Sequence, residues 1–152
     1  MADIETQARP ATEKLLSAEV GALYVELGKR LREVRRDPSL ASAFDMTTDS
    51  ALETMGSDKL REFGHQFFNR MNKQAYALMC GADSQNSAER ESLFKAFGFG
   101  KDAVAPALTA LLVVQLGLAP AIATVLAVLA VKLFFEPGYD AMCDAWKKGL
   151  PQ

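Results

Sequence analysis

The side chain best suited to acid–base or metal chemistry in this chain is its single histidine, His65. Its neighbours at helical spacing are polar, whereas Phe63 and Phe67 fall on the other side of the same predicted helix. One histidine cannot form a histidine-rich metal site, and no serine or cysteine stands beside it in a nucleophile motif. We therefore expect His65 to lie on the surface, and the sequence predicts no catalytic or metal-binding residues.

Two further patterns resemble ligand-binding motifs without completing them. The segment Gly98-Phe-Gly-Lys101 is similar to part of a phosphate loop, but it lacks the earlier glycine of that motif and the Ser or Thr after the lysine. Asp102 follows instead, and because its carboxylate would repel phosphate, we expect it to cap a helix. Glu89 and Glu91 point in different directions on a helix. The sequence thus predicts no cofactor, and we expect a protein that is not an enzyme.

The two cysteines, Cys80 and Cys143, do not show the C-x-x-C spacing of a zinc or redox site. The chain opens with polar and acidic residues rather than with the basic and apolar segments of a signal peptide, so we expect a cytoplasmic protein. In a reducing compartment both cysteines are expected to be free thiols with packing or surface roles. A shared disulfide, metal or redox role is the less favoured alternative.

Charge is balanced over the whole chain but concentrated locally. The 17 Lys and Arg against 19 Asp and Glu give a formal charge of −2, which argues against nucleic acid as a partner. A basic cluster at the end of a predicted helix comprises Lys29, Arg30, Arg32, Arg35 and Arg36. Cations at a helix end complement the helix dipole, which is the simplest interpretation. The alternative is contact with an acidic partner or anionic lipid through Lys29, Arg32, Arg35 and Arg36.

The uncharged segment from Ala103 to Val131 dominates the second half of the chain. Gly117 and Pro120 act on the same place within it, because glycine favours a helix end and proline favours a first helical turn. We predict two apolar helices joined as a hairpin over residues 102–135. The alternative is one continuous helix, about 43 Å long, with a kink at Pro120.

Amphipathic helices are predicted for most of the remaining chain. We expect residues 1–11 to form a flexible tail and residues 12–100 to hold two long amphipathic helices and a short one. The first runs from Thr12 to the break at Asp37-Pro38. The second begins at a capping box, Ser50 to Glu53, or at Ser57, and ends at Gly81.

The last two predicted elements complete a single domain. A short helix is expected over residues 89–97 and a terminal helix over residues 139–150, where Met142 and Trp146 are the apolar anchors. A chain of 152 residues with 49% hydrophobic residues has room for one core. The sequence therefore predicts one all-α domain over residues 1–152, a compact helical bundle with the apolar hairpin at its centre.

A helix that is apolar around its whole circumference must be covered on every side. Two such helices are difficult to enclose with the remaining chain, so we expect the excess to be covered by a second copy, another protein or lipid. Small residues at spacings of four form a ridge that lets helices approach closely. The candidate association residues are this ridge and the turn beside it, namely Ala119, Ala123 and Ala127 with Gly117 and Pro120.

The alternative is that the lipid of a bilayer surrounds the hairpin. The uncharged run exceeds the roughly 20 residues of a membrane span, and Lys101 and Lys132 flank it, so both lysines can stay on one side while the uncharged tip enters. Against this, each arm of about 15 residues spans only about 22 Å, less than the roughly 30 Å hydrocarbon core. In organisation alone, without a shared motif, the chain is similar to pore-forming toxin domains and apoptosis-regulator bundles.

Taken together, these features predict a non-enzymatic helical interaction protein that acts through self-association or through another protein bound by the hairpin. The alternative function is a membrane-docking or pore-forming effector or regulator that inserts the hairpin into a bilayer. We expect a cytoplasmic location for the first function and membrane association for the second.

Overall fold

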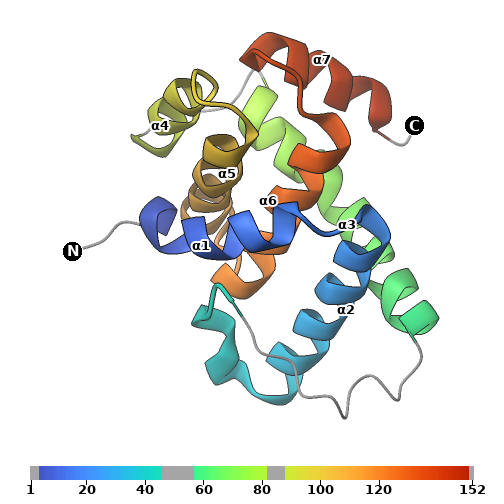
Figure 1. Ribbon diagram of the computed structural model, residues 1–152. Coiled ribbons are helices and arrows are strands. Elements are labelled where there is room, and N and C mark those ends of the chain that lie inside the picture. The colour runs from blue at the N-terminus through green and yellow to red at the C-terminus, as the bar shows by residue number, and fades with distance from the viewer. Residues whose placement is uncertain (1–3, 46–56, 82–87, 151–152) are drawn as a thin grey trace.

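The computed structural model describes residues 4–45, 57–81 and 88–150, and the regular structure in these ranges is helical (Figure 1). The prediction of an all-α helical bundle is confirmed. The predicted capping box at Ser50 to Glu53 lies outside the described residues. The helices are α1 (Ile4–Leu16), α2 (Val20–Arg36), the 3-10 helix η1 (Pro38–Ser42), α3 (Ser57–Cys80), α4 (Ala88–Ala96), α5 (Lys101–Leu116), α6 (Pro120–Phe134) and α7 (Tyr139–Gly149).

Helices α5 and α6 form the predicted hairpin at the centre of the bundle (Figure 1). Gly117 ends α5 in the left-handed conformation, with φ of 68°. Its N–H donates to Val113 O at 3.1 Å, and the N–H of Leu118 donates to Leu112 O at 3.4 Å, which satisfies the last carbonyls of α5. Pro120 then opens α6, where its missing N–H costs no hydrogen bond. One continuous helix, the alternative interpretation, is wrong.

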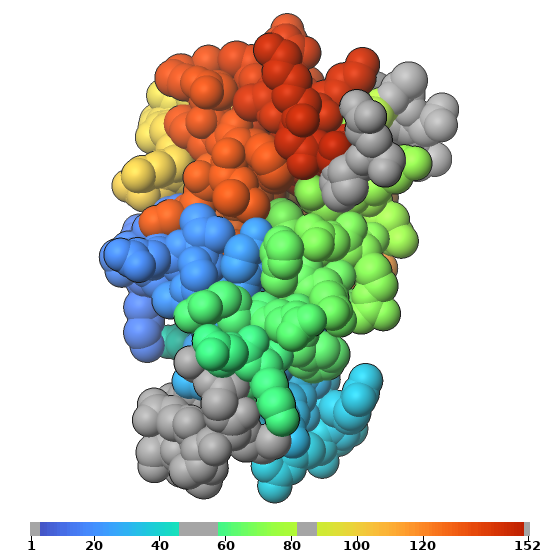
Figure 2. Space-filling model, turned by 90° about the vertical axis from the view of Figure 1, so that its right-hand side faces the viewer, coloured from blue at the N-terminus to red at the C-terminus, as the bar shows by residue number. Residues whose placement is uncertain are grey.

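The outer helices α1, α2, α3, α4 and α7 surround the hairpin. Helix α1 packs on α5 and α6, α2 packs on α6, and α4 packs on α5. Helix α3 pairs with α2 and also contacts α5 and α7. On the face seen in Figure 2, the blue N-terminal part of the chain lies beside the green α3, in agreement with the packing of α2 on α3. Residues 103–112 of α5 and 121–131 of α6 are consequently all buried.

The expectation that the remaining chain would have difficulty enclosing both arms is therefore wrong for residues 103–112 and 121–131. The reason lies at the N-terminus, where residues 4–11, expected in a flexible tail, belong to α1 and add a further covering helix. Ala8 and Ala11 are buried on that helix. Pro10 lies inside α1 and cannot donate a backbone hydrogen bond. The packing of Ala8 and Ala11 stabilises the helix by more than this lost bond costs.

The predicted long helix from Thr12 is also interrupted. The structure has two helices, α1 and α2, separated by residues 17–19. Ser17 Oγ donates to Lys14 O at 2.7 Å, a local bond that competes with continuation of the helix. The break allows α1 to cross the hairpin while α2 runs along α3 (Figure 1).

Helices α2 and α3 cross at two glycines. A Cβ atom built on Gly28 would lie 2.2 Å from Leu60 O, and one built on Gly64 would lie 2.0 Å from Tyr24 O. Real Cβ atoms do not approach a backbone oxygen this closely, so the crossing requires glycine on both helices. Sequence periodicity did not reveal this glycine contact, and in α3 the buried apolar positions are Leu60, Phe68, Ala75 and Met79 rather than the predicted Phe63 and Phe67 stripe.

The residue that caps the start of α5 is not the one predicted from the sequence. Gly100, with φ of 95°, occupies the cap position of α5, and Asp102 lies in the first turn rather than before it. A carboxylate in the first turn still interacts favourably with the positive end of the helix dipole. The predicted capping role of Asp102 is therefore wrong, although its place at this helix start has a physical reason.

Candidate functional site

The two threonines of the hairpin arms form hydrogen bonds within their own helix. Thr109 Oγ1 donates to Ala105 O at 2.9 Å, and Thr124 Oγ1 donates to Pro120 O at 2.7 Å. Each acceptor is a carbonyl of the same helix, four residues earlier. Neither hydroxyl would lose its partner if the hairpin moved to another apolar environment.

The tip of the hairpin, residues 115–120, lies beside η1 (Figure 1). Gln115 and Gly117 are exposed there, and Val114 just before them has 45% of its surface exposed. The tip contains no charged residue. It is therefore partly exposed on the surface of the described bundle, unlike residues 103–112 and 121–131.

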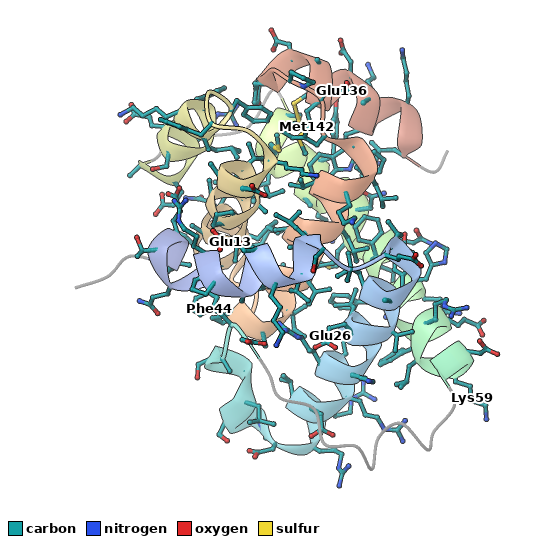
Figure 3. All side chains as sticks on the ribbon, in the orientation of Figure 1. Glu13, Glu26, Phe44, Lys59, Glu136 and Met142 are labelled. Carbon is teal, nitrogen blue, oxygen red and sulfur yellow. A yellow bond between two sulfur atoms is a disulfide. The ribbon has the colours of Figure 1, made fainter. Side chains whose placement is uncertain are left out.

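Arg30 connects this tip to α2. Its guanidinium Nη1 donates to Ala121 O in the first turn of α6 at 3.0 Å and to Phe44 O at 2.7 Å. Its Nε donates to the carboxylate of Glu26 at 2.9 Å, which balances the charge of a side chain only 1% exposed (Figure 3, Glu26 labelled). The expectation that Arg30 belongs to an exposed basic cluster is therefore wrong, because these acceptors allow it to be buried.

The other four basic residues lie near the surface at the end of α2. Arg35 and Arg36 are exposed, whereas Lys29 and Arg32 are half-buried. Arg36 Nη1 forms an ion pair with Glu33 at 3.6 Å. We call Lys29, Arg32, Arg35 and Arg36 the basic end of α2.

In Figure 1 the end of α2 lies at the lower edge of the molecule, and the turn between α5 and α6 lies above it, beside η1. Arg30 contacts the first turn of α6. From Arg30 to Arg36 the helix advances only about 9 Å, at 1.5 Å per residue. The structure thus packs the helix that carries the cationic surface against the arm that follows the uncharged tip, with the four cations on the side of α2 turned away from Arg30.

The predicted association ridge lies inside the bundle. Ala123 and Ala127 are fully buried, whereas Ala119 and Pro120 at the tip are half-buried and Gly117 is exposed. A partner protein would therefore reach the centre of the ridge only if the outer helices moved away. Only the tip residues of this set are accessible in the closed bundle.

The surface around His65 is a shallow polar pocket. The ring of His65 contacts the edge of the Tyr24 ring at 4.7 Å between centroids, and burial raises the pKa of the Tyr24 hydroxyl. Arg61 and Asp58 form an ion pair at 3.6 Å beside it. His65 is exposed, as predicted. Among the described residues, no three His, Cys, Asp or Glu side chains converge in a way that could hold a metal ion.

Cys80 and Cys143 form a disulfide, with 5.7 Å between their Cα atoms. The expectation of two free thiols is therefore wrong. Cys80 ends α3 and Cys143 lies in α7, 63 residues later. Their spacing carried no motif, because they become neighbours only when α7 folds back against α3.

No helix in the described ranges is, taken singly, both long and apolar enough to cross a bilayer. Helices α6 and α7 meet the length and composition criterion as a pair, but they are bent by 93° at the break between them.

Compared with known protein families, with curated proteins and with solved structures, the chain matches none of them significantly. The class of protein is therefore defined by the fold alone, as an all-α bundle built around a buried apolar hairpin.

Proposed function

We propose that this chain is a non-enzymatic, membrane-docking helical protein of the effector or regulator class, which inserts the tip of its α5–α6 hairpin among anionic lipids. The observation that carries this proposal is the packing of α2, which ends in the four cations, on α6, which begins at the uncharged hairpin tip (Figure 1). A single approach to a membrane would therefore bring both to the lipid headgroups.

The basic end of α2 supplies the first attraction. Lys and Arg side chains near an anionic surface each contribute about 1 kcal/mol at physiological ionic strength. Lys29, Arg32, Arg35 and Arg36 lie on one helix end, so they can face the same surface. The chain as a whole carries a negative net charge, so the rest of its surface is not attracted to anionic lipid. The attraction therefore acts at this helix end and orients the protein on the membrane.

The hairpin supplies the apolar contact. Its arms have 16 and 15 residues, so they are about 24 Å and 22 Å long, less than the roughly 30 Å hydrocarbon core. The tip can therefore enter the bilayer from one side without crossing it. Lys101 and Lys132, at the far ends of the arms, would remain near the headgroups.

Insertion requires the hairpin to leave the outer helices. The hydroxyls of Thr109 and Thr124 keep their partners within the arms, so they present no unpaired group to the lipid. The bonds from Arg30 to Ala121 O and from Lys132 Nζ to Leu16 O must break, and water or lipid headgroups can replace them. Lipid contact then takes the place of the packing that the outer helices provide.

Charge reversal at the basic end of α2 tests this docking. We expect Arg35→Glu/Arg36→Glu to lower the partition onto anionic vesicles by at least about 30-fold, the equivalent of two lost contributions of 1 kcal/mol. Flotation of vesicles containing phosphatidylserine measures the partition. The matched control is Lys73→Glu/Lys95→Glu, which makes the same change in net charge at exposed positions on α3 and α4. Equal loss in both double variants would show that net charge, not this surface, governs binding.

The second candidate function is self-association or binding of another protein. The observation that favours it is Phe99, which is 83% exposed between two glycines in the α4–α5 connection, close in sequence to the half-exposed Phe94. Large exposed aromatic side chains are typical of protein interfaces. Because the ridge at Ala123 and Ala127 is buried, this corner is the more accessible surface in the closed bundle.

A Phe99→Ser variant tests that second function. If Phe99 mediates association, light scattering after size-exclusion chromatography will show an oligomer for the natural chain and a smaller species for the variant. The helical content should not change, because Phe99 makes little contact with the core. A monomer in both samples would exclude self-association through this corner.

A further inference from the structure

Helix α7 is attached to the bundle at two places. In its first half, the Cys80–Cys143 disulfide joins it to the end of α3, and the hydroxyl of its first residue, Tyr139, donates to Met79 O. Arg90 of α4 donates to the same Tyr139 hydroxyl at 2.8 Å and to Leu78 O at 3.3 Å. The disulfide is the only covalent link among these contacts in the described part of the chain.

At its other end, α7 is held by Trp146. This side chain is fully buried, stacks on Phe134 of α6 with 5.5 Å between ring centroids, and contacts Tyr76 of α3 at 5.9 Å. Its indole N–H donates to Asn72 Oδ1 at 2.6 Å. Met142, one turn earlier, is also fully buried. Helix α7 therefore covers the end of α6, which is one arm of the hairpin.

We propose that the Cys80–Cys143 disulfide is a redox-sensitive switch that keeps α7 on α3 and α6, and that its reduction lets α7 detach and eases release of the hairpin. This regulation rests on the membrane-docking function proposed above. The reductant is a dithiol. One of its thiolates attacks a sulfur of the disulfide to form a mixed disulfide, and its second thiolate then displaces the remaining cysteine. Two electrons pass to the protein, which gains two thiols as the dithiol becomes a disulfide.

The length and the surface of α7 explain why its packing on the bundle would depend on the disulfide. The helix has 11 residues, fewer than the roughly 12 to 15 that an isolated helix needs for even marginal stability. Its face away from the core carries Asp140, Asp144, Lys147 and Lys148, which are all exposed. Gly138 precedes it with φ of 105°, a backbone conformation that favours glycine. Without the covalent link, the buried side chains of Met142 and Trp146 carry most of the docking.

Hydrogen exchange without lipid tests the switch itself. After complete reduction, confirmed by thiol titration, we expect amides of α7 to exchange many-fold faster, while residues 103–112 of α5 keep their protection. The emission of Trp146, the single tryptophan of the chain, should shift to longer wavelength as its ring becomes hydrated. A Cys80→Ser/Cys143→Ser variant should show both changes with or without reductant. Unchanged exchange in α7 after complete reduction would overturn the switch, whatever happens with lipid.

Flotation with anionic vesicles, repeated on oxidised and reduced protein, separates the switch from the function it regulates. We expect reduction to raise the vesicle-bound fraction and the Cys→Ser variant to bind equally in both conditions. Faster exchange in α7 with no binding in either redox state would overturn the membrane function and, with it, the regulatory role of the disulfide. Equal binding of oxidised and reduced protein would overturn the regulatory role alone.

Discussion

Replacing Gly64 with alanine is expected to lower the free energy of unfolding by about 3 kcal/mol or more. The added Cβ would lie 2.0 Å from Tyr24 O and 3.0 Å from Gly28 N, so α2 and α3 would have to separate. Both partners are backbone atoms, which cannot move aside by changing a rotamer. Urea unfolding followed by circular dichroism measures the change.

The matched control for this variant is Gly21→Ala on α2. A Cβ there would meet only the Arg61 Nε, at 3.7 Å, which is ordinary contact with a flexible side chain. Alanine also has a helix propensity about 1 kcal/mol better than glycine, so this variant should be at least as stable as the natural chain. Equal stability of Gly64→Ala and Gly21→Ala would contradict the close crossing of α2 and α3.

Reduction of the Cys80–Cys143 disulfide is expected to lower the free energy of unfolding by about 4 kcal/mol. The bond joins residues 63 positions apart, and closing a loop of this length removes much conformational entropy from the unfolded chain. Urea titrations of oxidised and fully reduced protein give the difference. Because the Cys80→Ser/Cys143→Ser variant cannot form the bond, its unfolding midpoint should not respond to reductant. A midpoint that is identical in oxidised and reduced natural protein would contradict the disulfide.

Several elements could be predicted from the sequence because their signals are local. Gly117 and Pro120 act within a few residues of the turn that they produce, so the hairpin was predictable. The end of α3 at Cys80 followed from the glycine at position 81. These features need no knowledge of what each helix packs against.

The features that escaped prediction depend on tertiary contact. Helix α1 forms despite Pro10 because it packs on α5, and the need for Gly64 arises only where α2 crosses α3. Likewise, Cys80 and Cys143 carry no motif, since their pairing depends on the position of α7. No pattern within one helix contains this information.

In the candidate site, too, local features could be predicted from the sequence and tertiary contacts could not. The basic end of α2 and the apolar hairpin were each predicted from composition and spacing, but their adjacency was not. Arg30 and Ala121, which join them, are 91 residues apart in sequence. Arg30 itself was placed with the exposed cations, because its burial depends on carbonyl acceptors from two distant segments. Sequence thus predicted the parts of the site, and the fold supplied their arrangement.

The central claim is that the hairpin tip enters the membrane, and a fluorophore at the tip tests it most directly. A Gln115→Cys variant provides one reactive thiol at an exposed position, since the natural cysteines are paired in the disulfide. An environment-sensitive dye attached there by a stable thioether can be followed in oxidised and reduced protein. A Gln74→Cys variant, exposed on α3, provides the control position.

With anionic vesicles and reductant, the account predicts that the dye at residue 115 shifts to shorter wavelength and is quenched by brominated acyl chains, while the dye at residue 74 is not. Vesicle binding in which the dye at residue 115 stays in water, or no binding at low salt, would contradict insertion of the hairpin.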